Sequence, residues 1–190
     1  MESSYTLDKE FNAIDFDIFP LKKGNYENCT FTNCTFSEAD LSKIVFDDCR
    51  FVTCDVSMAK LSQTAFRNVM FKDSKMLGLD FSTCNKIGLS FNFDNCLLNH
   101  ASFYQTKIKK IIFKDCKLHE TDFTECDVSE AIFEHCDLLG ARFEQTVLEK
   151  ADFRTAHNYV INPNKNRIKK AKFSATGISG LLQNFNIIID

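Results

Sequence analysis

The sequence predicts a single-domain repeat protein with a period of five residues, and three observations lead to this prediction. Large apolar side chains recur at every fifth position from Tyr26 to Phe81 and again, two residues out of phase, from Phe93 to Phe153. All nine cysteines share one position of this cycle, and in every unit except that of Cys84 a large apolar residue follows two residues later. Charged residues make up 26% of the chain, but none occupies the position of the large apolar residue or the position two residues before it. A period of five fits neither an α-helix nor a flat strand, so it indicates a repeat architecture.

The length of 190 residues suits one domain. Interruptions of the five-residue period divide this domain into segments. The expected segments are an N-terminal cap or first partial coil at 1–23, a first stack of coils at 24–81, a break at 82–92, a second stack at 93–155, and a loop, a final coil and a C-terminal segment at 156–190. A hydrophobic content of 44% with two prolines is typical of a folded globular chain. No apolar stretch reaches the length of a membrane span, and no export signal is evident, so we predict a cytoplasmic protein without membrane contact.

Several units carry a recognisable signature. The segments 39–43, 121–125 and 151–155 read Ala-Asp-Leu-Ser-Lys, Thr-Asp-Phe-Thr-Glu and Ala-Asp-Phe-Arg-Thr. They resemble the A(D/N)Lxx unit of the pentapeptide repeat family, and the resemblance extends over about residues 24–155. It implies an all-β fold, a right-handed quadrilateral (four-sided) β-helix with one unit on each side, closed here by a short C-terminal helix as a cap.

The order of apolar residue types is compatible with four sides. Residues 20 apart would then stack in columns, and in the second half two columns are aromatic and two are aliphatic. The expected columns are Phe93, Phe113, Phe133 and Phe153; Phe103, Phe123 and Phe143 on the opposite side; and, between them, Leu98, Leu118 and Leu138 and also Ile108, Val128 and Leu148. Stacked rungs of like shape pack well, which favours this arrangement.

The break at 82–92 holds two residues more than the period allows. These residues must either bulge from one corner or offset the two stacks of coils. A structural kink and a functional loop both remain open, because irregular exposed segments often carry binding sites.

The C-terminal segment differs from the repeats. Ser174 is a candidate N-cap for a short helix with Ile178, Leu181, Leu182 and Phe185 on one face, and a short apolar strand is expected at 186–190. An open β-helix end needs a cover, so the segment is predicted to be a cap. So much apolar surface also suits a homodimer interface, and the resemblance supports this, because gyrase-directed family members dimerise through this end.

No residue pattern points to catalysis or to a cofactor. Cys29, Cys34, Cys49 and Cys54 have spacing that resembles a zinc site, but the repeat explains them as inward-facing core residues, and we predict neither metal sites nor disulfides. His100 and His119 lie at outward positions without enough neighbouring ligands. Nucleophile triads, phosphate-binding loops and dinucleotide motifs are absent from the sequence, so we predict a protein that is not an enzyme.

Charge is distributed unevenly along the repeats. Between Asp115 and Glu149 acidic residues far outnumber the basic Lys117 and Arg142, whereas basic residues prevail after Arg154. The candidate partner-binding residues are the outward acids Asp115, Glu120, Asp122, Glu125, Asp127 and Glu130. An acidic rod suits a partner that normally holds DNA. The same charges also suit ion-pair rungs between coils, because residues 20 apart often have opposite sign.

The resemblance is specifically to the Qnr-like, DNA-mimic branch of the family. It implies a non-enzymatic protein that binds the type II topoisomerases DNA gyrase or topoisomerase IV and protects them from quinolones. One alternative is a scaffold with an unrelated protein partner, and another is an immunity-type protein that guards gyrase from a natural toxin. Direct nucleic-acid binding is not expected, since the sequence shows no basic stripe with stacking aromatic residues.

Overall fold

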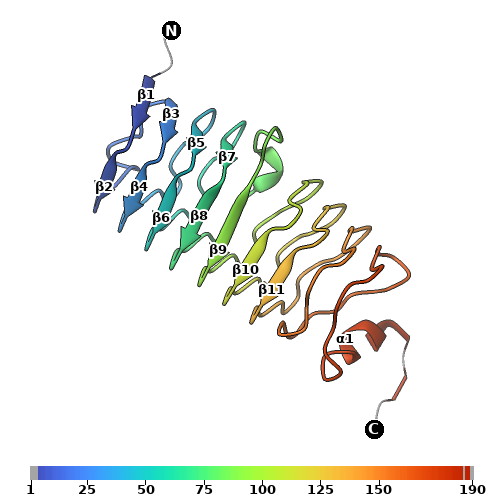
Figure 1. The fold of residues 1–190 in the computed structure, drawn as a ribbon. Helices are drawn as coiled ribbons and strands as arrows, with labels where there is room; N and C mark the ends of the chain where they lie inside the picture. The colour runs from blue at the N-terminus through green and yellow to red at the C-terminus, as the bar shows by residue number, and fades with distance from the viewer. Residues whose placement is uncertain (1–3, 186, 189–190) are drawn as a thin grey trace.

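In the computed structural model, which describes residues 4–185 and 187–188, the chain forms a right-handed, four-sided parallel β-helix (Figure 1). The first face is a sheet of β1 (Ser4–Leu7), β3 (Gly24–Glu27), β5 (Val45–Asp47) and β7 (Ala65–Arg67). The second face is a seven-stranded sheet of β2 (Glu10–Asn12), β4 (Thr30–Thr32), β6 (Arg50–Val52), β8 (Val69–Lys72), β9 (Phe91–Asp94), β10 (Ile112–Lys114) and β11 (Ile132–Glu134). The predicted fold class is confirmed.

The third and fourth faces are held by single bridges instead of extended strands. Thr35 pairs with Asp55 on the third face, and Ser102 pairs with Asp122 on the fourth. Partners on every face are parallel and, away from the break, 20 residues apart, as in the pairs Phe31–Phe51 and Phe113–Phe133. Each five-residue unit therefore occupies one side, and the chain turns a corner after every unit.

Aromatic rings fill the lumen in the predicted columns. Under the second face, Phe113 stacks on Phe93 at a centroid distance of 5.3 Å and on Phe133 at 5.1 Å. Under the fourth face, Phe123 stacks on Phe103 at 5.2 Å. The two columns meet edge to face, with an interplanar angle of 84° between Phe113 and Phe123. Such offset and edge-to-face contacts are the favourable geometries for aromatic pairs.

Where the second inward position of a unit holds cysteine, serine or threonine, the polar atom of the side chain often finds a backbone carbonyl as its partner. The Thr146 hydroxyl donates to the Phe123 carbonyl at 2.8 Å, and the Cys136 thiol lies 3.3 Å from the Phe113 carbonyl. Both side chains are completely buried. Because a buried polar group is costly when it lacks a partner, threonine, serine and cysteine suit this position, and Asn166 fits it by donating to the Phe143 carbonyl at 2.9 Å.

The aspartate of the A(D/N)Lxx signature has a local role. It precedes the lumen residue, points outward and accepts a hydrogen bond from the backbone N–H two residues later. Asp40 accepts from Ser42 at 2.9 Å, and Asp122 accepts from Thr124 at 2.9 Å. These Asx turns bend the chain toward the next corner, which explains why Asp and Asn recur there.

Acid is expected to destabilise the fold through these aspartates. Hydrogen bonds from Ser42, with the nearby Lys23, lower the pKa of Asp40 to about 2, and hydrogen bonds from Arg154 likewise lower the pKa of Asp152. A carboxyl with a depressed folded-state pKa stabilises the fold above its unfolded pKa of about 3.9, and this stabilisation is lost as the pH falls through the folded value. The thermal midpoint should therefore fall from about pH 4 to about pH 2. Asp40→Asn keeps the turn acceptor but removes the charge, so it should show a shallower fall.

The corners are built from left-handed residues. Most units end on a residue with positive φ, and many of these are not glycine, for example Thr53 at φ 54° and Met58 at φ 57°. A β-branched residue is strained in this region, whereas asparagine and glycine adopt it readily. The corner at Thr53 is therefore a weak point of the coil.

Replacing Thr53 by asparagine is expected to stabilise the protein by about 1 kcal/mol. Thr53 is exposed, and its backbone N–H bond to the Lys72 carbonyl does not depend on the side chain. Urea unfolding measures the change. Thr32→Asn is the matched control on strand β4, where asparagine is disfavoured and should destabilise. Equal effects at both positions would contradict the assignment of strain to the corner.

The break is absorbed on the first face and leaves the second face continuous. Pairing across it is 22 residues apart, as in Phe71–Phe93, and β8 pairs directly with β9. A 3₁₀ turn, η1 (Phe81–Thr83), lies at its start. The chain leaves the regular path between Asn85, whose N–H donates to the Thr64 carbonyl, and Ser90, whose N–H donates to the Phe66 carbonyl. We call the segment 85–90 the bulge.

The C-terminal segment forms α1 (Ser179–Leu182) followed by the 3₁₀ turn η2 (Gln183–Phe185), packed at the end of the rod (Figure 1). The prediction that Ser174 caps this helix is wrong: its hydroxyl accepts the Gly177 N–H in a preceding turn, and the N-cap residue is Ile178. Of the strand predicted at 186–190, residues 186, 189 and 190 lie outside the described part, and Ile187 and Ile188 are not in a strand.

Candidate partner-binding surfaces

The structure does not bring the predicted acidic residues together on one surface. Asp115, Glu120, Glu125 and Glu130 are all corner residues with positive φ, five positions apart. Because the chain turns one corner per unit, they lie on the four successive corners of a single coil. Asp122 and Asp127 lie on the fourth and first faces of the same coil, where they form bridges with neighbouring coils. The acidic run in the sequence therefore becomes a ring around the rod.

Three of these carboxylates have a histidine or lysine partner on a neighbouring coil. The acid of Asp115 lies 3.4 Å from His135 Nδ1, that of Glu120 lies 3.5 Å from His100 Nδ1, and that of Glu130 lies 3.7 Å from Lys150 Nζ. These exposed pairs contribute little to stability individually. The Lys150 ammonium reduces the charge that Glu130 presents to a partner.

The remaining acids form a continuous edge. Asp122 accepts the Thr124 N–H, and Glu125 accepts the Gln105 side-chain amide at 2.8 Å. Asp127 lies 3.2 Å from Lys109 Nζ; its partial burial opposes ionisation, but hydrogen bonds from Ser129 and Lys109 lower its pKa. We call Asp122, Glu125 and Asp127 the acidic edge, since they follow one another around the corner between the fourth and first faces.

The histidines are also paired with carboxylates. Asp137 is the centre of one such group: His119 Nε2 lies 2.7 Å from it, His157 Nε2 lies 3.8 Å from it, and the Asn158 amide donates to it at 2.8 Å. Partial burial opposes ionisation of Asp137, but the bonds from Asn158 and His119 lower its pKa. Within residues 4–185 and 187–188, no three histidine, cysteine or acidic side chains are arranged to hold a metal ion.

All nine cysteines are free and buried in the lumen. Burial raises the pKa of Cys49 to about 12, and burial has the same effect on Cys54. A thiol with such a pKa stays protonated at neutral pH and is a poor nucleophile or metal ligand. Cys29, Cys34, Cys49 and Cys54 are all buried in the lumen, so packing along the rod accounts for their spacing.

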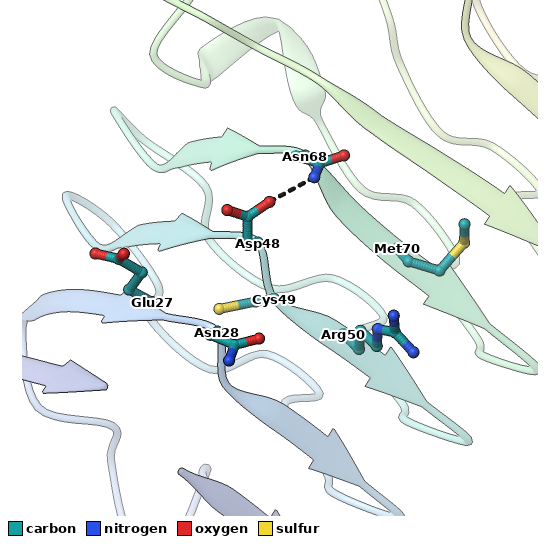
Figure 2. Close-up of a pocket in the computed structure, with 7 residues that line it drawn as sticks. All are labelled: Glu27, Asn28, Asp48, Cys49, Arg50, Asn68 and Met70. Atoms are coloured by element: carbon teal, nitrogen blue, oxygen red, sulfur yellow. Dashed lines mark hydrogen bonds between the residues drawn. The ribbon is translucent and has the colours of Figure 1, made fainter. Parts of the chain in front are cut away.

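A groove of about 500 Å³ runs along the corner between the first and second faces (Figure 2). Its lining residues are Glu27, Asn28, Asp48, Cys49, Arg50, Asn68 and Met70. Figure 2 shows the Asn68 amide directed at Asp48 on the adjacent coil, to which it donates a hydrogen bond. Asn28 donates in the same way to Asp8 at 2.6 Å. The groove thus carries an Asp–Asn ladder that links successive coils, and its carboxylates already have partners.

The predicted dimer residues divide into two pairs. Ile178 and Phe185 are exposed by 50% and 47%, whereas Leu181 packs against the hydrophobic core and Leu182 is half-buried. The segment docks through two glycines on Tyr159, and the Ile161 N–H donates to the Gly180 carbonyl at 2.9 Å. The same short segment thus covers the last coil with one side and presents apolar side chains with the other.

None of the helices in the described ranges has the length and apolar character to cross a membrane. The helical parts are the single turn of α1 and the short turns η1 and η2.

Comparison with known proteins identifies the repeat. The model of the pentapeptide repeat region matches residues 25–92 and 89–157. A search of curated proteins by sequence found no match. Among solved structures, the chain is similar to full-length QnrB1, a plasmid-mediated fluoroquinolone resistance protein, with 20% identity, a TM-score of 0.51 and coverage of 97% of this chain and 100% of that one.

A second solved structure is more distant. HetL, a pentapeptide repeat protein involved in heterocyst differentiation regulation in the cyanobacterium Nostoc sp. strain PCC 7120, is 15% identical, with a TM-score of 0.45 and coverage of 88% of this chain and 86% of that one. The family model matches most of the residues, and the five-residue lumen pattern and the four-sided coil agree with it. The chain belongs to the pentapeptide repeat family.

Proposed function

We propose that this protein is a non-enzymatic, cytoplasmic binding protein that contacts a type II topoisomerase, DNA gyrase or topoisomerase IV, and protects it from quinolones. The observation that carries the proposal is the likeness of the rod to QnrB1, a fluoroquinolone resistance protein, over nearly the whole of both chains.

The acidic edge is the part of the predicted site that we assign to the topoisomerase contact. Asp122 and Glu125 have no lysine, arginine or histidine partner within 4 Å among the described residues, whereas Glu130 pairs with Lys150 and Asp115 and Glu120 each lie beside a histidine. Carboxylates that are not neutralised internally retain the field that attracts a DNA-binding surface. The paired acids are expected to contribute less to this contact.

Binding to immobilised gyrase tests this assignment. We expect the double variant Asp122→Asn with Glu125→Gln to weaken binding about tenfold, because two charge-assisted contacts are removed. The matched control, Glu120→Gln with Glu130→Gln, removes the same charge from two other corners and should bind almost as the unchanged protein does. Equal loss in both variants would contradict a defined acidic edge.

We further propose that the C-terminal segment mediates a homodimer through Ile178 and Phe185, with Leu181 and Leu182 supporting them from the side that meets the rod. Exposed apolar side chains on a terminal element support this proposal. Light scattering should give a dimer, and Ile178→Ser with Phe185→Ser should give a folded monomer. A monomer for the unchanged protein would contradict the dimer and weaken the DNA-mimic interpretation.

One observation favours a second candidate function. Most acids of the second half are paired with cations or histidines of neighbouring coils, as in Arg167–Glu149 at 2.7 Å and Lys165–Glu144 at 3.2 Å. A rod that neutralises its own faces suits a scaffold with an unrelated protein partner. Unaltered gyrase activity at micromolar protein would favour this candidate.

A further inference from the structure

Basic side chains gather around the bulge on the first face. Arg67 comes from strand β7, Lys86 from the bulge itself, and Lys107, Lys109 and Lys110 from the following coil. We call these residues the basic patch. All the lysines of the patch are exposed. We propose that the patch binds the phosphate backbone of a nucleic acid.

The contacts of the bulge hold these cations close together. Lys86 Nζ donates to the Gln105 carbonyl on the next coil at 3.2 Å. Arg67 lies against the other side of the bulge, since a Cβ placed on Gly88 would lie 3.8 Å from its Cγ and its Nε. Lys107 and Asp127 form the bridge that continues the first face. The patch therefore spans three successive coils, about 10 Å at the usual strand spacing.

Acids only border the patch. Asp47 lies 3.6 Å from Arg67 Nη1, and Asp127 lies 3.2 Å from Lys109 Nζ. Within the described residues, Lys86, Lys107 and Lys110 have no carboxylate within 4 Å. These three charges remain available to an anion, even though the formal net charge of the chain is −3.

The composition of the patch favours a nucleic acid over other anionic partners. Lysine is depleted in protein–protein interfaces, whereas nucleic-acid interfaces are much more positive. Stable attachment to a membrane surface needs more apolar anchoring than one residue, and Ile87, exposed by 77%, is the large apolar side chain of the bulge tip. Polyanion binding through lysines requires no base-specific groups, so the contact is to the backbone.

This surface adjoins the acidic edge, because Asp127 of the edge pairs with Lys109 of the patch, but the proposal does not rest on the topoisomerase contact. Direct nucleic-acid contact was not expected from the sequence, which shows no basic stripe with stacking aromatic residues. Arg67, Lys86 and Lys107 are scattered along the chain. Folding places them side by side, since residues about 20 apart share a face.

Fluorescence anisotropy with a labelled DNA duplex of about 20 base pairs tests the proposal. Three phosphate contacts predict that the association constant falls about 40-fold between 50 and 200 mM salt. Lys107→Glu with Lys110→Glu should weaken binding at least about tenfold at low salt. The matched control, Lys114→Glu with Lys117→Glu, makes the same charge change at exposed positions on the second and third faces and should bind DNA within about twofold of the unchanged protein.

Two outcomes would overturn the proposal. One is that the unchanged protein does not bind DNA at low salt. Binding of the basic patch to vesicles of anionic phospholipid in place of DNA would count as this outcome. The other is an equal loss of DNA binding in both double variants, which would indicate that only net charge matters. Thermal unfolding of both variants establishes that they remain folded.

Discussion

Replacing Phe113 by alanine is expected to lower the free energy of unfolding by about 4 kcal/mol. Phe113 is completely buried on strand β10 and stacks between Phe93 and Phe133. The backbone ladders on both sides fix the spacing of the coils, so the neighbouring rings cannot close the gap. The variant therefore loses both the transfer free energy of the ring and its aromatic contacts.

Urea unfolding measures this effect against two controls. Phe113→Leu keeps most of the buried volume and should cost about 1 kcal/mol. Ile112→Ala lies on the same strand, but its side chain is 38% exposed and faces outward, so it should change stability little. A cost for Phe113→Ala no greater than that for Ile112→Ala would contradict the central role of the ring column.

Replacing Gly180 by alanine should detach the C-terminal segment from the rod at a cost of about 3 kcal/mol. A Cβ at this position would clash with the Tyr159 backbone oxygen and would lie 2.9 Å from the Tyr159 ring carbon Cδ2. The backbone oxygen cannot move aside, because Tyr159 itself is buried in the last coil. The segment must therefore shift, and the bond from Ile161 to Gly180 is lost.

Thermal unfolding and the binding of a fluorescent apolar dye measure the detachment of the C-terminal segment. Ser179→Ala is the matched control, since Ser179 is the adjacent exposed residue of α1 and alanine is a better helix former. Only Gly180→Ala should lower the thermal midpoint and expose the end of the lumen to the dye. An unchanged midpoint for Gly180→Ala would show that the segment does not depend on its close approach to Tyr159.

The interior of the fold was predictable from the sequence because each lumen position is constrained every five residues. Phe93, Phe113 and Phe133 had to stack once one unit was assigned to each side. The position of Asp40 in the signature also has a local explanation, since its side chain closes its own turn. Such constraints act within one coil or between neighbouring coils, and a sequence pattern records them directly.

The surfaces were less predictable because neighbours in sequence are not neighbours on a face. Asp115, Glu120 and Glu125 look clustered in the sequence, yet a step of five residues moves each to a new corner. Arg67 and Lys107 look unrelated in the sequence, yet both lie on the first face because two turns of about 20 residues separate them. The Ser174 cap failed for a different reason: the side chain closes a turn at Gly177 just before the helix begins.

A DNA gyrase supercoiling assay with the purified protein, with and without ciprofloxacin, tests the proposed function most directly. We predict that the protein restores supercoiling in the presence of the drug and that it inhibits the enzyme at higher protein concentration. The acidic-edge variant should restore less than the Glu120 and Glu130 control. No effect of a confirmed dimer at micromolar concentration, with or without the drug, would contradict the topoisomerase assignment.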